Sequence, residues 1–509
     1  MAAPPRSQAR ERRNTMADKA TIVLFSHVSN TRSITGAEKL LLFFSRELTA
    51  YFDCILVAPQ DGKLTRLARG YGIKVRLMSI PLVYGMYTPY AGLPADLRKL
   101  QESADYQELC RWLAGLRPAF IISSTCVHAL PPIAAKSLGI PVVWKISERI
   151  VDNEYTPLSI ELIHRHSDEI LSISQTAAAC FPDDIREGKV TQLPPSWNDS
   201  DMMFNAWSKL RGERRGELGI APGEPLIGYV SSFINKEKGL EHFVKMAVQV
   251  HEQHPAARYL VVGTPGDKGY YDRCVRRVKM EGLTSRFRFV GYEECLPAAY
   301  CAMDILVVPS LIREGFGMTA LEGYAFSKPV VAYDSGGLRE ILTAAGCDEL
   351  LVPAGETALL AERVNALLAD QAQAAVIGSQ ARERIEAVYG PAAYRARLQG
   401  LAERWHLRYC LRPPQAAGGE ALPPAALPAG EETPAAARPR GRSARRASRL
   451  RAARLRRGKL RRAGARGGKR TGRRKRAAGT ARGRASGGGK KRRAGQAARR
   501  RSRRRRKAG

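Results

Sequence analysis

The chain of 509 residues lacks the sequence features typical of membrane-spanning, secreted and zinc-ribbon proteins. It has no apolar run near the roughly 18 residues that a membrane-spanning helix needs. Its first residues, MAAPPRSQARERRNT, have no apolar segment typical of a signal peptide, and either Met1 or Met16 could start translation. None of its nine cysteines forms a Cys-x-x-Cys pair, which argues against zinc ribbons and disulfide frameworks. We therefore expect a cytoplasmic protein with reduced thiols.

Acidic residues are missing from the C-terminal part of the chain. Of the 83 Lys and Arg residues, 34 lie between 438 and 509, a stretch that has no Asp, Glu or aromatic residue. The other 49 basic residues face 48 acidic ones, so the rest of the chain is nearly neutral and the net charge of +35 describes the tail. Such a segment cannot bury a core, and we expect disorder over 438–509 after a Pro/Ala-rich linker over 413–437. The tail would bind polyanions such as nucleic acid, anionic membrane or an anionic wall polymer, or it is a solvated extension without a role.

Between these ends, apolar runs alternate with amphipathic segments. This alternation predicts parallel sheets with helical crossovers, and the length is too great for a single core. The first half has strand-like runs at 21–26, 53–58, 73–79, 119–123, 141–146, 170–173 and 190–193. Helices are expected over 37–48, 64–71 and 96–116. A second set of strand-like runs follows at 225–231, 259–262, 286–290, 304–308, 329–333 and 350–353.

The most informative stretch is 309–340, which reads PSLIREGFGMTALEGYAFSKPVVAYDSGGLRE. A buried strand precedes it, then come a glycine-broken loop, a helix from about Met318 and a second strand. This layout aims backbone N–H groups at an anion. Glu314 precedes the glycines and Glu322 lies on the helix, so two carboxylates bracket the free N–H groups of Gly317, Met318 and Thr319. A sugar diphosphate needs this combination, because phosphate oxygens accept from N–H groups and sugar hydroxyls donate to carboxylates.

The pattern E-G-F-G-x-x-x-x-E, set between D-x-x-V-x-P-S, K-P-V-V-A and G-G-x-x-E-I-L, resembles the signature of family 4 glycosyltransferases. These enzymes have the GT-B fold, two Rossmann-like doubly wound α/β domains that face each other across a cleft. They retain the configuration at the anomeric carbon of the sugar and need no metal. The resemblance covers about 21–408 and is strongest over 228–353.

The resemblance implies roles for several residues of the second half. Glu314 would hold hydroxyls of the donor sugar, Glu322 the ribose, and Lys238 the leaving diphosphate. Gly36, Phe316, Gly317, Met318 and Thr319 would complete the donor site. On the donor side, the sequence departs from the family where Phe233 stands in place of the usual Arg and where Thr35 replaces the first glycine of a pair.

On the acceptor side, two residues follow first-domain strands. Family members carry a histidine after the strand that matches 120–123; here Ser124 or Thr125 takes that place and His128 comes later. His128 is a candidate for the acceptor side, with a structural or capping role as the alternative. Glu148 ends the segment WKISE and is a candidate for acceptor binding, with helix capping as its alternative.

The expected organisation is a disordered N-terminus over 1–19, an acceptor domain over 20–200 and a donor domain over 201–390. A helix over 391–412 packs back on the first domain in this fold. The expected function is transfer of a sugar from a nucleotide diphosphate sugar to a glycan or lipid-linked acceptor, with retention, in glycan, glycolipid or cell-envelope polysaccharide synthesis. No metal or other cofactor is expected, and peripheral association with the inner membrane face is a further expectation. The alternatives are a GT-B epimerase or phosphorylase, and a degenerate transferase that binds polyanions.

Overall fold

The computed structural model of the chain describes residues 19–31 and 34–411. The segment expected to be disordered at the N-terminus, apart from Lys19, lies outside these residues. The same holds for the predicted linker over 413–437 and the basic tail over 438–509. Among the described helices, none has the length and apolar character that crossing a membrane would require.

The first sheet has seven strands in the order β3-β2-β1-β4-β5-β6-β7, and all of its pairings are parallel. The strands are β1 (Thr21–Phe25), β2 (Asp53–Ala58), β3 (Lys74–Leu77), β4 (Phe120–Ser124), β5 (Val142–Ile146), β6 (Glu169–Ser172) and β7 (Val190–Gln192). Strands β4 and β5 are buried along their whole length and β1 is buried in all but its first residue, as expected for largely apolar sequences in a parallel sheet. The predicted doubly wound arrangement is confirmed, and the order of strands reverses between β1 and β4.

The second sheet has six parallel strands in the order β10-β9-β8-β11-β12-β13. The strands are β8 (Leu226–Ile234), β9 (Arg258–Pro265), β10 (Phe287–Val290), β11 (Ile305–Val308), β12 (Val330–Tyr333) and β13 (Leu351–Val352). The order repeats that of the first six strands of the other sheet, and it reverses between β8 and β11. Ligands of open parallel sheets bind outside the carboxyl ends of the strands at such a reversal.

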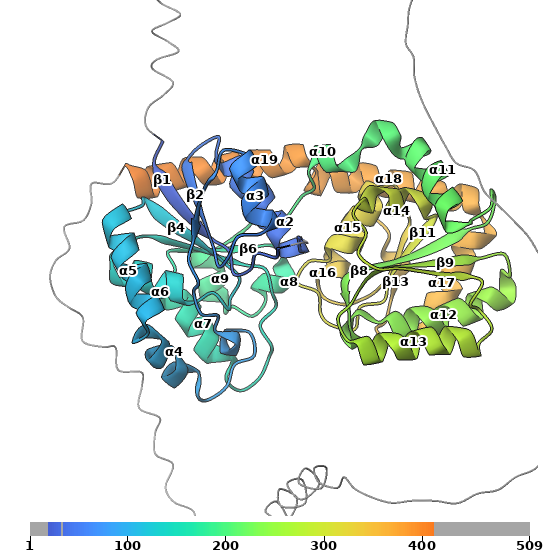
Figure 1. Cartoon of the computed structure of the whole chain (residues 1–509), viewed down its shortest axis with the longest axis horizontal. Helices are drawn as coiled ribbons and strands as arrows, with labels where there is room; N and C mark the ends of the chain where they lie inside the picture. Colours follow the sequence, from blue (N-terminus) through green and yellow to red (C-terminus); the bar gives the residue numbers. More distant parts are fainter. Residues whose placement is uncertain (1–18, 32–33, 412–509) are drawn as a thin grey trace, which may run out of the picture. The chain divides into compact units, whose positions relative to one another are not determined.

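Helices cover both faces of each sheet (Figure 1). In the first domain the helices are α2 (Gly36–Leu48), α3 (Lys63–Gly70), α4 (Leu93–Gln101), α5 (Ala104–Leu116), α6 (Leu130–Ser137), α7 (Thr156–Arg165), α8 (Gln175–Ala178) and α9 (Asp183–Lys189). From there to the second domain run α10 (Asp199–Met202) and α11 (Trp207–Leu218). The others are α12 (Leu240–Gln253), α13 (Lys268–Met280), α14 (Leu296–Ala302), α15 (Met318–Ala325), α16 (Gly337–Ala345), α17 (Thr357–Ala369), α18 (Gln371–Tyr389) and α19 (Pro391–Trp405).

The prediction of one continuous helix over 96–116 is wrong, because the chain forms two helices there. α4 ends at Gln101, and Ser103 caps α5 by accepting a hydrogen bond from the backbone N–H of Tyr106. A serine side chain that competes for backbone N–H groups favours a helix start over a helix interior. The break lets α4 and α5 pack separately, and both contribute to the core that lies on one face of the first sheet.

The last helix belongs to the core on the other face of the first sheet. Tyr394, Leu398 and Trp405 of α19 pack in one cluster with apolar residues of α2 and α3. Trp405 is completely buried, and its indole N–H donates to the carboxylate of Glu169 on β6 at 2.8 Å. The chain therefore returns to its first domain after completing the second.

Candidate functional site

A cavity of about 500 Å³ lies at the carboxyl ends of both sheets. Its lining includes the residues directly after the two pairs of strands where the strand order reverses. From the first domain these are Ser26 and His27 after β1, and Thr125 after β4. Pro309 and Ser310 follow β11 in the second domain, and Ser231 lies within the carboxyl half of β8. Both domains therefore place their ligand-binding edge at one cavity.

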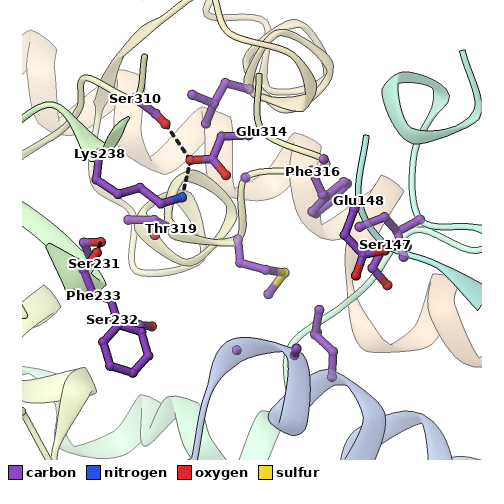
Figure 2. A pocket seen from close by; sticks show the side chains of 18 of the residues that line it. Ser147, Glu148, Ser231, Ser232, Phe233, Lys238, Ser310, Glu314, Phe316 and Thr319 are labelled. Atoms are coloured by element: carbon purple, nitrogen blue, oxygen red, sulfur yellow. Dashed lines mark hydrogen bonds and ion pairs between the residues drawn. The ribbon is translucent and has the colours of Figure 1, made fainter. Parts of the chain in front are cut away.

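An ion pair forms the centre of the second-domain wall. The ammonium of Lys238 donates to Oε1 of Glu314 at 2.7 Å, and the hydroxyl of Ser310 donates to the same oxygen at 2.6 Å (Figure 2). The Glu314 side chain is 19% exposed and that of Lys238 is 34% exposed, so both groups reach the cavity. An ammonium has three donor hydrogens, so Lys238 can keep this contact while it donates to a further anion.

Backbone geometry fixes both partners of the pair. Gly239 follows Lys238 with φ of +71°, and a Cβ there would meet the backbone oxygen of Pro309 at 1.9 Å. Only glycine allows this close approach, which holds Lys238 against the end of β11. Glu314 forms an isolated parallel bridge with Gly336, and the N–H of Gly337 donates to its carbonyl at 2.8 Å. The turn at Gly336 and Gly337, the second glycine turn of the motif, thus positions Glu314.

The N-terminus of α15 faces the cavity beside this pair. Gly317, Met318 and Thr319 all line the cavity, as the motif predicts, and the first N–H groups of a helix lack intrahelical acceptors. These donors and the positive end of the helix dipole favour an anion. Phe316 also lines the wall, but its ring is buried and packs edge-on against Tyr389.

Glu322 is not among the cavity-lining residues. It lies on α15, partly buried, and its Oε2 accepts the hydroxyl of Tyr300 at 2.7 Å. Burial raises the pKa of Glu322, while nearby Lys39 of α2 and the Tyr300 hydrogen bond lower it. A ligand group would have to extend past the cavity wall to reach this carboxylate, so its assignment to the ribose stays a prediction.

On the first-domain side, Gly36 and Ala37 at the start of α2 line the cavity. Thr35, which stands in place of the family's first glycine, is the N-cap of α2. It forms a capping box in which its hydroxyl accepts from the N–H of Glu38 at 3.3 Å and the Glu38 carboxylate accepts its N–H at 2.8 Å. With Thr35 in place of the glycine, a side chain caps the start of α2, and the close backbone approach that a glycine allows is lost.

The structure places His128 behind the cavity wall. Its ring is 1% exposed and packs edge-on against Phe25, with 6.0 Å between ring centroids. Burial and nearby His27 lower the pKa of His128 to about 3, so the ring is neutral at ordinary pH. The histidine that lines the cavity is His27, which follows β1. Sequence comparison with the family missed it, although its position directly after the first strand is a usable signal.

Glu148 lines the cavity, and it caps no helix. Its Oε2 accepts the backbone N–H groups of Ser147 at 3.2 Å and Cys126 at 3.3 Å, which ties the ends of β4 and β5 together. Lys145 on β5 also lines the cavity and donates to the Ser147 hydroxyl at 3.0 Å. Burial lowers the pKa of Lys145 to about 8, although the nearby carboxylate of Glu148 raises it. The sequence predicted Glu148 here and missed Lys145.

Contacts between the two domains hold the motif loop in place. A Cβ on Gly315 would meet the backbone oxygen of Ser147 at 2.4 Å, and the hydroxyl of Ser174 donates to the Gly315 carbonyl. Glu340 of α16 accepts the backbone N–H of Thr176 at 2.7 Å and that of Gln175 at 3.0 Å. The last glutamate of the motif therefore fastens the second domain to α8 of the first.

Two further findings concern the donor side and metals. Phe233 lines the cavity where the family has an arginine. Lys238 is thus the cavity's cation on the second-domain side. Within residues 19–31 and 34–411, no three His, Cys, Asp or Glu side chains gather in a way that could hold a metal ion.

Known proteins resemble the chain in sequence over part of its length. The profile of the family described as Glycosyl transferases group 1 matches residues 224–370. The D-inositol 3-phosphate glycosyltransferase of Nocardia farcinica is 36% identical over 167 residues, which are 32% of this chain and 36% of that protein. The 2-deoxystreptamine glucosyltransferase of Streptomyces kanamyceticus is 32% identical over 278 residues, which are 52% of this chain and 70% of that protein.

Solved structures resemble the chain over more of its length. Anabaena HepE, crystallised with UDP and glucose, superimposes with a TM-score of 0.60 at 19% identity, covering 76% of this chain and 100% of that one. The sucrose-phosphate synthase of Thermosynechococcus elongatus gives a TM-score of 0.58 at 20% identity, with 76% and 100% covered. These likenesses show the fold, with its two doubly wound domains.

Proposed function

The chain belongs to the group 1 family of glycosyltransferases, and we propose that it transfers a sugar from a nucleotide diphosphate sugar to an acceptor hydroxyl. The observation that carries this proposal is the Lys238–Glu314 pair beside the N-terminus of α15 in the shared cavity. Cation and helix N-terminus suit a diphosphate, and the carboxylate suits the hydroxyls of its sugar.

In this proposal, bond breaking places new negative charge on the leaving diphosphate. Lys238 and the free N–H groups of Met318 and Thr319 stabilise that charge, and they are held in place before the reaction starts. Glu314 orients the donor sugar by accepting its hydroxyls, while Ser310 and Lys238 hold the carboxylate in place. Glu322 accepts a ribose hydroxyl. We further propose retention at the anomeric carbon and no requirement for a metal.

The proposal also includes the kind of acceptor. The relatives act on acceptors as different as D-inositol 3-phosphate and 2-deoxystreptamine, judging by their names, so family membership alone selects none of them. A further relative is a mannosyltransferase of a monoacylated phosphatidylinositol mannoside in Corynebacterium glutamicum. We propose a glycan or lipid-linked acceptor at the first-domain wall near Glu148, in a reaction of glycolipid or cell-envelope synthesis at the inner membrane face.

The test is a panel of nucleotide sugars with the purified full-length protein. We expect one or two of them to raise the melting temperature, and we expect slow release of the nucleotide diphosphate by donor hydrolysis. Lys238→Met should abolish that release, whereas Lys245→Met should retain it, because Lys245 forms an exposed ion pair with Glu241 on α12. If no nucleotide sugar binds or releases its diphosphate, the proposed function is wrong.

A further inference from the structure

The charged side chains of the cavity wall include one cation that has no ion-pair partner. These side chains are Lys145, Glu148, Lys238 and Glu314, so their formal charges sum to zero. Lys238 pairs with Glu314, and Glu148 accepts two backbone N–H groups at the ends of β4 and β5. Lys145 is 7% exposed and forms no ion pair with any residue that the structure describes. A buried charge without a partner is costly to the fold, so its place at the cavity wall points to an anionic ligand.

The ammonium of Lys145 lies close to the motif loop of the second domain. It donates to the hydroxyl of Ser147 at 3.0 Å, and Ser147 itself lines the cavity (Figure 2). The backbone oxygen of Ser147 lies so close to Gly315 that a Cβ there would be 2.4 Å from it. Gly315 comes two residues before Gly317, the N-cap of α15. A first-domain cation with two hydrogens left to donate is therefore near the helix N-terminus at which the diphosphate is proposed to bind.

The second-domain wall by itself compensates little of the charge of a diphosphate. Each phosphate of a nucleotide diphosphate sugar is negatively charged, and departure of the sugar adds a further negative charge to the terminal phosphate. The charge of Lys238 is already opposed by Glu314 at 2.7 Å. Phe233 is 49% exposed on the same side of the pocket as Lys238 and offers an apolar ring (Figure 2). The N–H groups of α15 supply only partial charges, so the departing diphosphate still lacks a full positive charge on this wall.

We propose that Lys145 binds the terminal phosphate of the leaving diphosphate from the first-domain side, an inference that rests on the glycosyltransferase function proposed above. The bond between the anomeric carbon and the terminal phosphate oxygen breaks, and its electron pair stays on that oxygen. The acceptor oxygen bonds to the carbon, and the proton of its hydroxyl follows to the departing phosphate. Lys145 stabilises the charge that appears on the phosphate before this proton arrives. Because the acceptor wall has to border the bond that breaks, Lys145 contacts the terminal phosphate and not the inner one.

The experiment compares nucleoside diphosphate and monophosphate as ligands of the full-length protein. The Kd values of UDP and UMP, and of GDP and GMP, are measured, and the pair that binds more tightly is used for the variants. Lys145→Met removes the charge and keeps much of the side-chain volume. It should weaken the binding of the diphosphate at least tenfold and that of the monophosphate less than twofold, because the monophosphate lacks the terminal phosphate. The kcat of donor hydrolysis should fall by at least ~10², the scale of one preorganised transition-state contact.

The matched control is Lys136→Met. Lys136 pairs with Asp168 at 3.0 Å on the same domain and is not among the cavity-lining residues. Its substitution also removes one positive charge from the first domain, so it corrects for any effect of net charge on nucleotide binding. The control should leave both Kd values and kcat unchanged.

The pH dependence of the wild type provides a second readout that needs no variant. Burial lowers the pKa of Lys145 to about 8, although the nearby carboxylate of Glu148 raises it. The ammonium therefore loses its charge as the pH rises through about 8, and the diphosphate should lose more affinity than the monophosphate between about pH 7.5 and 9. Ionisation of the base affects both ligands alike, so the ratio of the two Kd values reports on the terminal phosphate.

Other titratable groups of this wall do not change charge in that range. Burial lowers the pKa of His27 from 6.5 and raises those of Cys126 and Tyr87. In Lys145→Met the ratio of Kd values should not change with pH, which excludes Lys238 on the opposite wall as the titrating group. Thermal unfolding of the same samples shows whether the variant is folded, and removal of an unpaired buried charge should not lower its melting temperature.

Three results would overturn the inference: unchanged affinity of Lys145→Met for the diphosphate, an equal loss of affinity for diphosphate and monophosphate, or a ratio of Kd values in the wild type that does not depend on pH. Should Lys145→Met fail to fold, the pH dependence of the wild type decides alone. Failure of the proposed function is distinguishable from all three, because the wild type would then bind neither UDP nor GDP and would release no nucleotide diphosphate from any donor.

Discussion

Glu314→Gln keeps the size and shape of the side chain at the centre of the cavity and removes its charge. In the wild type, one carboxylate oxygen accepts both Lys238 at 2.7 Å and Ser310 at 2.6 Å. The amide oxygen can still accept both of these hydrogen bonds, but it gives Lys238 no counter-charge. It also offers sugar hydroxyls a neutral acceptor in place of an ionised one, so the variant separates the effect of charge from that of shape.

The expected losses differ greatly between stability and catalysis. Because the Lys238 side chain is 34% exposed, solvent screens the ion pair, and its loss should cost at most about 1 kcal/mol of unfolding free energy. That corresponds to less than about 4 °C in melting temperature for a domain of this size. Charge-assisted hydrogen bonds contribute about 1.5–3 kcal/mol, and a preorganised contact that acts in the transition state contributes about 10²-fold or more in rate. We therefore expect kcat to fall by at least ~10² in a folded protein.

The assay is steady-state transfer or donor hydrolysis, with kcat and KM determined separately, alongside thermal unfolding of the same samples. Glu241→Gln is the matched control, since it removes an ion pair of 2.8 Å on the exposed face of α12 and should leave kcat unchanged. If Glu314→Gln retains kcat within about threefold of the wild type while folded, the carboxylate has only a structural role and the reasoning fails.

Four further predictions follow from the same site and the rest of the chain. Glu322→Ala should weaken nucleotide binding by about 1.5–3 kcal/mol, measured by calorimetry, because a ribose hydroxyl loses a charged acceptor; unchanged affinity would exclude the ribose assignment. Activity should survive EDTA, and loss that Mg²⁺ or Mn²⁺ restores would contradict the metal-free proposal. Burial depresses the pKa of His128 to about 3 from an ordinary value of 6.5, so the unfolded chain binds the extra proton and stability falls as pH drops below 6.5, by about 2 kcal/mol at pH 5. Denaturant unfolding at several pH values should show a shallower dependence in His128→Gln; an unchanged slope would refute this. Finally, deleting 438–509 should abolish salt-sensitive binding to anionic vesicles, because 34 basic residues lie there, and undiminished binding would assign that affinity to the rest of the chain.

Local sequence determined the elements around the motif. The run 304–308 is continuous apolar sequence, and it forms the fully buried strand β11. The residue types predicted the glycine-containing loop and the start of a helix at Met318. Gly317 has φ of +106°, a conformation that glycine tolerates and other residues rarely adopt. Glu314 and Lys238 were both predicted to lie at the site, and both line the cavity. These features depend on contacts between residues near in sequence, or on a pattern long enough to identify the family.

Only the tertiary structure brought distant segments to one cavity and decided which side chains face it. Glu314 and Lys238 are 76 residues apart, and their ion pair depends on β8 and β11 being neighbours in the sheet. From the sequence we predicted His128 and not His27, but the turn after β4 sends His128 into the core against Phe25, while His27 lines the cavity. Lys145 lies in a strand of apolar residues. The alternation of side chains along a strand does not show whether a buried lysine faces the cavity or the edge of the domain. Burial, charge pairing and access are properties of the packed chain. For this reason the sequence predicted the donor motif, but on the first-domain wall it predicted Gly36 and Glu148 and missed His27 and Lys145.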